Sequence, residues 1–303
     1  MGEIKNMEIK KCVYGIFLKI LILFFGIDNA KKFDSKFRFK KDLNLKNPQT
    51  LADKVAYIEL HKQSHLAPKC TDKYAVRNYV KSKELEEILI PMVGGPWNKI
   101  EEIDFSNLAE DIVIKATHGC KMNYIITNKE KLDTVDCKKK LNKWLKTTYG
   151  KFSIEPHYYN IPHRLYAEKY LKELDGLIDY KFHCINGEPE FILICSERKI
   201  NESNGKMMVT LDLFDKEWKP ISEVISSGLE IPGKGDIKKP TLLEEMKEVA
   251  RKLSKDFDFV RVDLYQVGEK IYFGELTFSP ACCVFPYFTD KFLLEQGKKL
   301  KIK

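Results

Sequence analysis

The stretch that decides the fold is VRVDLYQVGEKIYFGELTFSP, residues 260–280. Two runs rich in β-branched and aromatic residues, 260–265 and 271–276, flank a short bend that contains Gly268. Strand-forming runs joined by a glycine-containing bend of this length are typical of a β-hairpin. The apolar residues alternate along both runs, so one face of this hairpin is predicted to pack against a core.

The polar residues of the hairpin are predicted to share its other face. Arg261 and Asp263 lie two residues apart on the first strand, and Glu275 and Thr277 repeat that spacing on the second. Two carboxylates that face each other on a hairpin repel unless a cation lies between them, and oxygen ligands of this kind suit Mg²⁺. Arg261 would neutralise a phosphate or a developing oxyanion beside the metal. The alternative is an exposed edge hairpin with a solvated pair of Arg261 and Asp263, and the apolar opposite face argues against it.

Outward from this hairpin, the sequence predicts an α+β fold. Asn186-Gly187 is a turn signal of type I′, which predicts a second hairpin. Helices combined with antiparallel hairpins argue against a doubly wound parallel sheet. Six further strands are predicted at 111–116, 124–127, 164–171, 180–185, 191–195 and 207–213, and helices at 50–62, at 72–85 and from Leu243 onward.

Two other segments carry candidate ligand-binding residues. In DIVIKATHGCKMNYIIT, residues 111–127, a strand ends near Lys115 and a small-residue loop with Gly119 follows, which suits binding of a phosphate chain. This segment lacks the spacing of a Walker P-loop, and a hairpin glycine is common. In RLYAEKYLKE, residues 164–173, Glu168 could meet an adenine amine or a ribose, although a solvated Glu-Lys pair is the simpler reading.

Taken in series, these segments resemble the ATP-grasp enzymes, and most closely the TupA-like ATP-grasp family of bacterial surface-polysaccharide pathways. The resemblance runs from LNLKNPQTLADK at Leu43 through TDKY, VIKATHG, AEKYL, DYKF and RVDLY to GELTFSP. It implies two α+β subdomains that clasp ATP between antiparallel sheets, preceded by a helical region. The expected division is 1–30 for an apolar and basic segment, 31–110 for the helical region, 111–170 for the lid subdomain and 171–303 for the subdomain with the metal site.

The resemblance also implies site residues. Arg261 and Lys115 are expected to be catalytic, and Asp263 and Glu275 to bind Mg²⁺, with Thr277 in the place where ligases more often have Asn. His118 is expected to contact phosphate, assist a proton transfer or remain solvated. The ATP-binding residues are expected to be Lys73, Lys115, His118, Gly119, the hinge of Glu168, Lys169, Tyr170 and Leu171, and one of Asp179 and Lys181.

The implied reaction joins a carboxylate to an amine through an acylphosphate made from ATP. The implied carboxylate is a uronic acid on a nucleotide sugar, a lipid carrier or a growing glycan, and the amine is an amino acid or a small amino alcohol. A kinase, or a glycosyltransferase-associated enzyme of polysaccharide synthesis, is the alternative. Ala281-Cys282-Cys283 replaces the Gly/Ser-rich turn of relatives, which puts the acceptor geometry in doubt.

Charge distinguishes the N-terminal region from the rest of the chain. The net charge is +8, and the first 50 of the 303 residues hold 11 basic and 5 acidic residues. The remainder is close to neutral, which argues against nucleic acid as a ligand. An apolar run, 12–27, lies among these cations and predicts either a helix on an anionic membrane surface through residues 1–41 or a buried helix. The eight cysteines lack metal-ligand spacing and predict a reduced, cytoplasmic protein. If the apolar helix lies on a membrane surface, the protein is expected to be peripheral at the inner face of the cell membrane.

Overall fold

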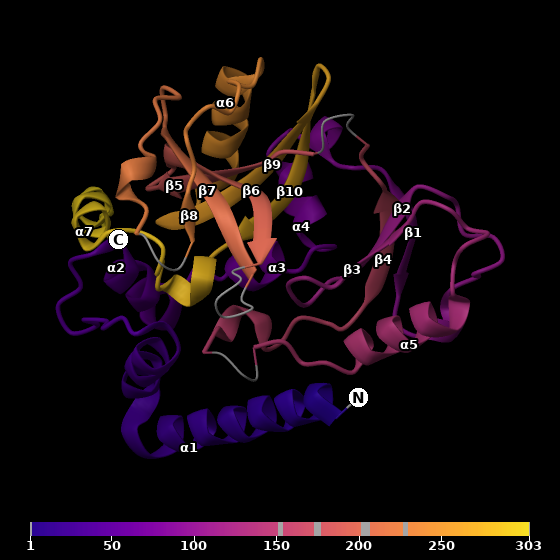
Figure 1. Ribbon diagram of the computed structural model, residues 1–303, viewed down its shortest axis with the longest axis horizontal. Coiled ribbons are helices and arrows are strands. Elements are labelled where there is room, and N and C mark those ends of the chain that lie inside the picture. Colours follow the sequence, from indigo (N-terminus) through magenta and orange to yellow (C-terminus); the bar gives the residue numbers. More distant parts are fainter. Residues whose placement is uncertain (1, 151–153, 173–176, 201–206, 227–229, 303) are drawn as a thin grey trace.

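The computed structural model describes residues 2–150, 154–172, 177–200, 207–226 and 230–302. They form two β-sheets flanked by helices, with α1 along one edge of the molecule below both sheets (Figure 1). The helices are α1 Gly2–Phe39, α2 Leu51–Tyr57, α3 Ala67–Thr71, α4 Val76–Ser82, α5 Thr134–Leu145, α6 Leu243–Ser254 and α7 Asp290–Lys299. A π-helical turn, Ile58–Lys62, continues α2, and short 3₁₀ turns occur elsewhere, including Pro156–Tyr158 and Pro280–Cys283.

The larger sheet has six strands in the order β10-β9-β5-β6-β7-β8, and all neighbours are antiparallel except β7 and β8. Asn186 and Gly187 both have positive φ at the turn between β5 and β6, as the predicted type I′ hairpin requires. The strands are β5 Asp179–Ile185, β6 Glu188–Ile200, β7 Met207–Asp215, β8 Ile231–Pro232, β9 Phe259–Val267 and β10 Lys270–Thr277.

The smaller sheet has four strands in the order β1-β4-β2-β3. Its strands are β1 Met92–Trp97, β2 Ile112–Ala116, β3 Asn123–Ile126 and β4 Leu165–Lys169. β1 was not expected, because Gly94, Gly95 and Pro96 are residue types that sequence patterns associate with turns. Gly95 has a φ of 86° and lies on the backbone of Tyr166, so no larger residue fits there.

Helices cover both faces of the larger sheet. On one face, α4 and α6 pack on Phe182, Val260 and Val262, and this cluster includes the apolar positions of the β9–β10 hairpin. On the other face, α2 and α7 cover one end, around Phe191 and Phe259. Arg261 and Asp263 lie on this same face, further along β9 than Phe259. The alternation of β9 therefore places these site residues next to an apolar core.

α1 consists of two helical halves that meet at Gly26, whose φ of 80° and ψ of 163° break the helix. Leu18 and Ala30 are buried against Ile154, and many apolar side chains of the first half are exposed. The predicted buried helix therefore holds only for a narrow face of α1. By length and composition alone, Val13–Phe39 is long and apolar enough to cross a membrane.

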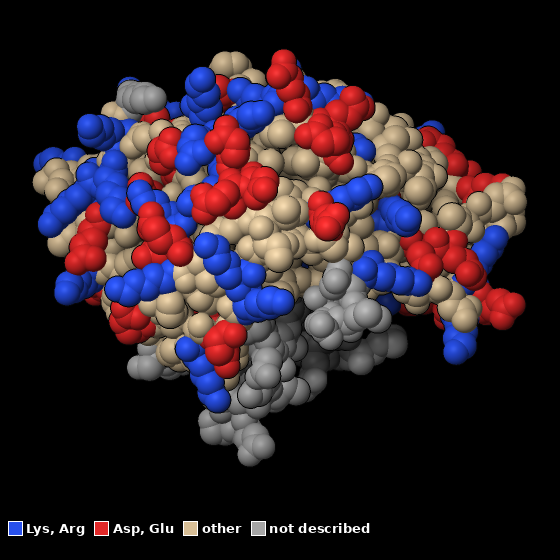
Figure 2. All heavy atoms as spheres, turned by 90° about the horizontal axis from the view of Figure 1, so that it is seen from above, with Lys and Arg blue, Asp and Glu red and all other residues tan. Residues whose placement is uncertain are grey.

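On the side of the molecule away from α1, positive and negative side chains are mixed. Seen from above, Lys and Arg alternate with Asp and Glu over the face shown in Figure 2, and they form no continuous basic band on that face. This distribution gives a nucleic-acid backbone no extended positive track on the side that the figure shows.

Candidate active site

The register of the β9–β10 hairpin brings the predicted metal and catalytic residues together. Asp263 lies opposite Glu275, and Arg261 lies opposite Thr277. Arg261 donates two hydrogen bonds to Asp263, from Nε to Oδ1 at 2.6 Å and from Nη2 to Oδ2 at 2.7 Å. Its Nη2 also lies 3.1 Å from Glu275 Oε1 and 3.0 Å from Thr277 Oγ1. The guanidinium thus separates the two carboxylates that would otherwise repel each other.

Two lysines complete the neutralisation of these acids. Lys73, from the turn before α4, lies with its Nζ 2.6 Å from Glu275 Oε2. Lys181, on the neighbouring strand β5, lies 2.9 Å from Asp263 Oδ2 and also contacts Asp179. Three carboxylates therefore face three cations in the described part of this site. These charges balance, so an anionic ligand that takes one of the cations would leave a carboxylate for a divalent cation to neutralise.

The electrostatics of the acids differ according to their neighbours. Burial alone would raise the pKa of Glu275, but Lys73 and Arg261 outweigh it and hold that pKa below its usual range. Burial raises the pKa of Asp179 to about 6, and the negative charge of Asp263 adds to this effect. Glu275 is therefore a carboxylate at neutral pH, as a metal ligand must be.

A cavity of about 420 Å³ lies over this surface. That volume falls within the range of small-molecule and cofactor sites. Seven predicted site residues line it: Lys73, Lys115, Asp179, Arg261, Asp263, Glu275 and Thr277. Lys181 touches two of these residues and is not itself part of the lining.

Lys115 reaches the cavity from the smaller sheet. It lies on β2, and its ammonium group contacts Glu168 on the paired strand β4. Glu168 is 4% exposed, so Lys115 is its neutralising partner. The cavity thus lies between residues of the two sheets, as binding of a nucleotide between subdomains requires.

All four residues of the predicted hinge, Glu168 to Leu171, lie outside the lining of this cavity. Lys169 is exposed, and its backbone N–H donates to Pro91 O. Tyr170 donates its N–H to Asp111 O at 2.7 Å, and Leu171 is half-buried. Their expected contact with adenine remains a prediction.

His118 and Gly119, the predicted phosphate-loop residues, are not part of the lining of this cavity. His118 is 1% exposed, stacks on His163 and has its Nε2 3.0 Å from Trp144 O at the end of α5. A Cβ on Gly119 would lie 3.0 Å from Met122 Sδ, so this glycine serves close packing in the loop. Burial lowers the pKa of His118, as expected for a neutral side chain in a core. The sequence reading did not anticipate this packing, because α5 approaches the loop from residues further along the chain.

Other cavity residues were missed by the sequence analysis. Tyr149, Tyr158, Glu155 and Ser279 line the cavity beyond the carboxylates, with the turn Pro280–Cys283 beside them. Glu155 Oε1 accepts a 2.6 Å hydrogen bond from Ser279 Oγ. No sequence motif marked these positions, because they meet only when the 3₁₀ turn at Pro156–Tyr158 packs against the end of β10.

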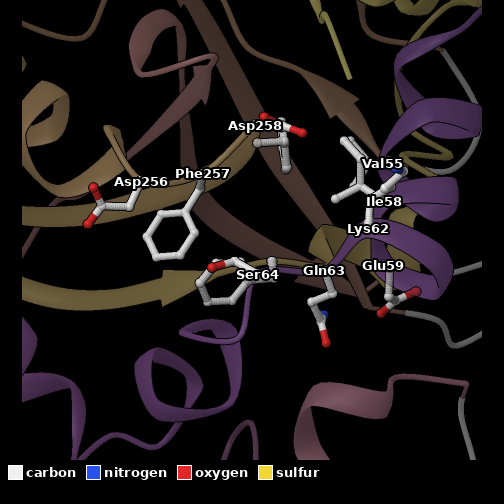
Figure 3. A pocket seen from close by; sticks show the side chains of 11 residues that line it. Val55, Ile58, Glu59, Lys62, Gln63, Ser64, Asp256, Phe257 and Asp258 are labelled. Atoms are coloured by element: carbon white, nitrogen blue, oxygen red, sulfur yellow. The ribbon is translucent and has the colours of Figure 1, made fainter. Parts of the chain in front are cut away.

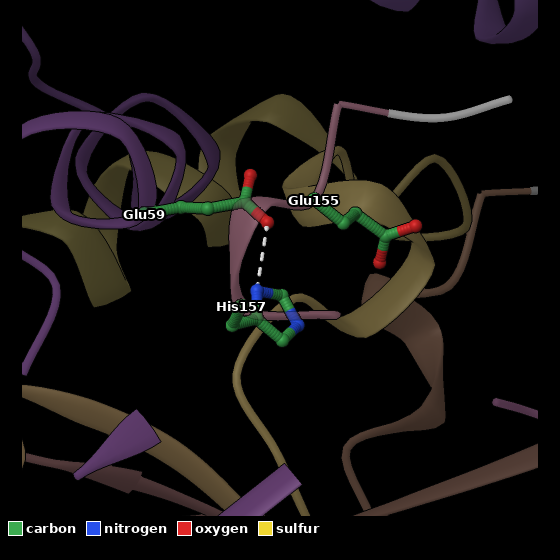
Figure 4. Close-up of side chains that lie close together, drawn as sticks. All are labelled: Glu59, Glu155 and His157. Atoms are coloured by element: carbon green, nitrogen blue, oxygen red, sulfur yellow. Dashed lines mark ion pairs between the residues drawn. The ribbon is translucent and has the colours of Figure 1, made fainter. Parts of the chain in front are cut away.

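Behind Glu155 lies a buried cluster of charged residues (Figure 4). His157 Nδ1 lies 3.6 Å from Glu59 Oε1, and Lys31 Nζ lies 2.5 Å from Glu59 Oε2. Burial, together with the positive charge of Lys31, lowers the pKa of His157 to about 3. The imidazole is therefore neutral at neutral pH, and its approach to Glu59 is not an ion pair there. The grouping of Glu59, Glu155 and His157 could hold a metal by geometry, but Lys31 already supplies the cation.

A second cavity, of about 200 Å³, has Glu59, Gln63, Asp256 and Phe257 among its lining residues (Figure 3). A third, of about 550 Å³, is lined by residues that include Lys40, Asp53 and Asp290. Neither is lined by any of the predicted site residues. The cavity over β9 and β10, which seven predicted site residues line, is therefore the candidate active site.

Known structures with a similar fold are distantly related. The D-alanine–D-alanine ligase of Bacillus anthracis is 14% identical, with a TM-score of 0.45 over 70% of this chain and 58% of that chain. The D-alanine–D-alanine ligase of Helicobacter pylori is 13% identical, with a TM-score of 0.43 over 84% and 70%. The ATP-grasp ligase PsnB, complexed with its minimal precursor, Mg and ADP, is 10% identical, with a TM-score of 0.40 over 72% and 53%. The present chain thus matches little more than half of the first of these relatives, and no curated protein gives a significant match.

The family follows from the sequence itself. The family model described as TupA-like ATP-grasp matches residues 53–301, which is most of the chain. This match confirms the predicted family and its ATP-grasp fold. It also contains every element that lines the cavity over β9 and β10. The chain belongs to the TupA-like ATP-grasp family.

Proposed function

We propose that this protein is a ligase that uses ATP to join a carboxylate to an amine. The observation that carries the proposal is the convergence of Lys73, Lys115, Arg261, Asp263 and Glu275 on one cavity. Lys73 and Lys115 come from outside the β9–β10 hairpin. Together with Arg261 they give the cavity three cations that could bind phosphate oxygens. Phosphoryl transfer depends mainly on such positioning and charge neutralisation, which these residues supply.

The reaction has two steps. An oxygen of the substrate carboxylate attacks the γ-phosphorus of ATP, the bond to the β–γ bridging oxygen breaks, and ADP leaves. The amine nitrogen then attacks the acyl carbon, phosphate leaves with the electron pair of the C–O bond, and the nitrogen loses a proton. Arg261 is placed to neutralise negative charge on the transferred group, because its guanidinium lies between the two carboxylates of the cavity.

The residues of the hairpin fit a magnesium site. Asp263 and Glu275 offer carboxylate oxygens to the cavity, and the Thr277 hydroxyl lies 3.1 Å from Glu275 Oε1. An all-oxygen donor set suits Mg²⁺, which commonly combines one or two carboxylates with the phosphates of a nucleotide. When bound, the ion would supply further neutralisation of phosphate charge.

The proposed carboxylate is a uronic acid of a surface polysaccharide or of its precursor, and the amine is an amino acid or a small amino alcohol. Tyr149 and Tyr158 lie beyond the carboxylates, and aromatic faces suit the packing of a sugar ring. Glu155, in the same part of the cavity, could hold an ammonium group. We place the protein in the cytoplasm at the inner face of the membrane. Its seven described cysteines are free thiols, as expected in a reducing compartment.

The test is release of ADP by the purified full-length chain over a panel of UDP-uronates, with and without amines. A ligase completes its turnover, with release of ADP and formation of an amide, only when both the uronate and the amine are present. Accumulation of a stable phosphorylated sugar without need of an amine would assign a kinase instead. Absence of ATP binding by calorimetry in the presence of Mg²⁺ would contradict both assignments.

A further inference from the structure

The first half of α1 leaves an apolar side uncovered. Most of its exposed apolar residues recur with helical spacing and share one side, opposite buried Leu18. Soluble proteins rarely expose a continuous apolar stripe of this length without a partner for it. The exposed residues of this side, with their exposed fractions, are Val13 61%, Ile16 56%, Phe17 40%, Ile20 47%, Leu23 78% and Phe24 71%; Phe25, 63% exposed, lies off this side near the kink.

The structure argues that this helix lies on a membrane and does not span one. In the second half of α1, Lys31, Asp34 and Ser35 are each 1% exposed against the core, so this half cannot enter hydrocarbon. The first half runs from Gly2 to the kink at Gly26, but residues 2–11 are mostly polar. Its apolar part, from 12 to 25, is shorter than the roughly 20 apolar residues that a spanning helix needs. Tyr14 donates a 2.8 Å hydrogen bond to Asp34 Oδ1 and holds the two halves together.

The exposed lysines of α1 favour an anionic lipid surface as the partner of its apolar side. Lys19 is exposed on the first half, Lys36 is exposed on the second, and Lys40 is exposed just after it. Each cation near an anionic leaflet adds to the attraction. A second copy of the chain would bring the same excess of positive charge to the interface, so self-association through this side is disfavoured.

The same helix touches two walls of the candidate active site. Arg38 Nη2 lies 3.6 Å from Cys282 Sγ, and Cys282 lines the cavity. Lys31 Nζ donates a 2.9 Å hydrogen bond to Ile154 O, next to Glu155, which lines the cavity as well. Both contacts come from the second half of α1. The first half reaches the same wall through Leu18, which packs in one cluster with Ala30 and Ile154, so α1 lies between the exposed apolar side and this wall of the cavity.

We propose that α1 binds an anionic lipid surface and that the carboxylate substrate is carried by a lipid in that surface. This inference rests on the proposed ligase function and chooses one of the three carriers that the sequence allows. A soluble nucleotide sugar would gain nothing from a membrane held one helix away from its site. A lipid-linked sugar is confined to that surface and reaches the cavity at a high local concentration.

The experiment compares two probes in the full-length protein. Methyl β-D-glucuronide is soluble, and dodecyl β-D-glucuronide is incorporated in vesicles of phosphatidylcholine with 30% phosphatidylglycerol. ADP release is measured with an amine, and vesicle binding is measured by co-sedimentation at low and high salt. The double variant Leu23→Ser/Phe24→Ser is compared with Val135→Ser, a control on α5 that is 79% exposed. Point variants are used because Leu18 and Ala30 pack on Ile154, which a truncation would expose.

The expected result is at least tenfold faster ADP release with the dodecyl glucuronide. The double variant loses this gain and the vesicle binding, and it keeps the rate on methyl glucuronide. Equal rates on both probes, sedimentation independent of lipid charge, or a wild-type dimer that the double variant dissociates would overturn the inference. If neither glucuronide is used, the proposed function with a uronate fails and the lipid-linked substrate fails with it. Vesicle binding alone then decides whether α1 is a membrane helix.

Discussion

Two clusters of buried charge lie a short distance apart in this protein, and they are built in different ways. The hairpin cluster takes Arg261, Asp263 and Glu275 from two adjacent strands within 15 residues of sequence. The cluster of Lys31, Glu59 and His157 takes each residue from a different segment, with Cys283 Sγ 3.3 Å from Glu59 across 224 positions. In the first, the Arg261 and Glu275 side chains are 13% and 31% exposed toward the candidate active site, whereas in the second all three side chains are 1% exposed.

This difference predicts different consequences of mutation. Charges that face a cavity can be reached by water and exchange partners with a ligand, so they serve turnover more than stability. Charges that are enclosed lose their partner outright when one residue is removed, and an isolated buried charge is costly. The predictions below test that distinction in order of decreasing expected effect.

The largest effect is expected for Lys31→Met. The substitution leaves the 1% exposed carboxylate of Glu59 without its cation, and loss of one partner of a buried pair costs about 3 to 5 kcal/mol of stability. The free energy of unfolding in urea measures it. Adding Glu59→Gln should restore part of the loss, and Lys36→Met, whose side chain is 59% exposed, should change little. A loss below about 1 kcal/mol for Lys31→Met would show that the pair is not enclosed.

Asp263→Asn and Glu275→Gln should each lower ADP release by about 100-fold, which corresponds to about 2.7 kcal/mol. Each variant replaces a carboxylate of the proposed metal site by a weaker neutral ligand. We expect a smaller effect on unfolding than for Lys31→Met, since the cavity admits water to the remaining charges. Glu188→Gln, on the exposed start of β6, is the matched control. Unchanged turnover in both site variants would exclude the hairpin as the metal site.

The pH dependence of stability should report on His157. Burial, together with Lys31, lowers the pKa of this histidine to about 3, from an ordinary value near 6.5. The unfolded chain binds the proton first, so His157 contributes stability above pH 6.5 that is lost as the pH falls toward 3. At pH 5 the wild type should have lost about 2 kcal/mol more than His157→Gln, relative to pH 7. Denaturant melts at both pH values measure this, with His65→Gln as an exposed control; parallel profiles for wild type and His157→Gln would contradict it.

The smallest effect is expected for Lys115→Ala. Loss of one phosphate-binding charge should raise the dissociation constant of ATP about tenfold, or about 1.4 kcal/mol. Calorimetric titration with the nucleotide measures it, and Lys172→Ala, an exposed residue paired with Asp111, is the control. If the folded variant binds ATP normally, Lys115 serves only to neutralise Glu168.

The sequence predicted the hairpin cluster because strand periodicity determines which side chains share a face, and that rule acts over a few residues. Local sequence patterns also predicted the α+β class, the type I′ turn and the strands of the larger sheet that enter the core. β1 escaped prediction because Gly94, Gly95 and Pro96 form a strand only when β4 pairs with them. The burial of His118 was not predicted, because α5, whose Trp144 contacts it, comes later in the chain. The cluster at Lys31 depends wholly on such long-range packing.

The turn Pro280–Cys283 has a consequence for the chemical reactivity of the protein. Ala281, Cys282 and Cys283 all have positive φ, although none of them is a glycine and L-residues rarely adopt this conformation. Burial raises the pKa of the Cys282 thiol to about 12, so almost none of it is thiolate at neutral pH. Alkylating reagents and peroxide attack the thiolate, not the thiol. Cys282, which lines the candidate active site, should therefore remain unmodified under conditions that consume ordinary thiols, and the folded protein should need no reducing agent to protect that wall of the cavity.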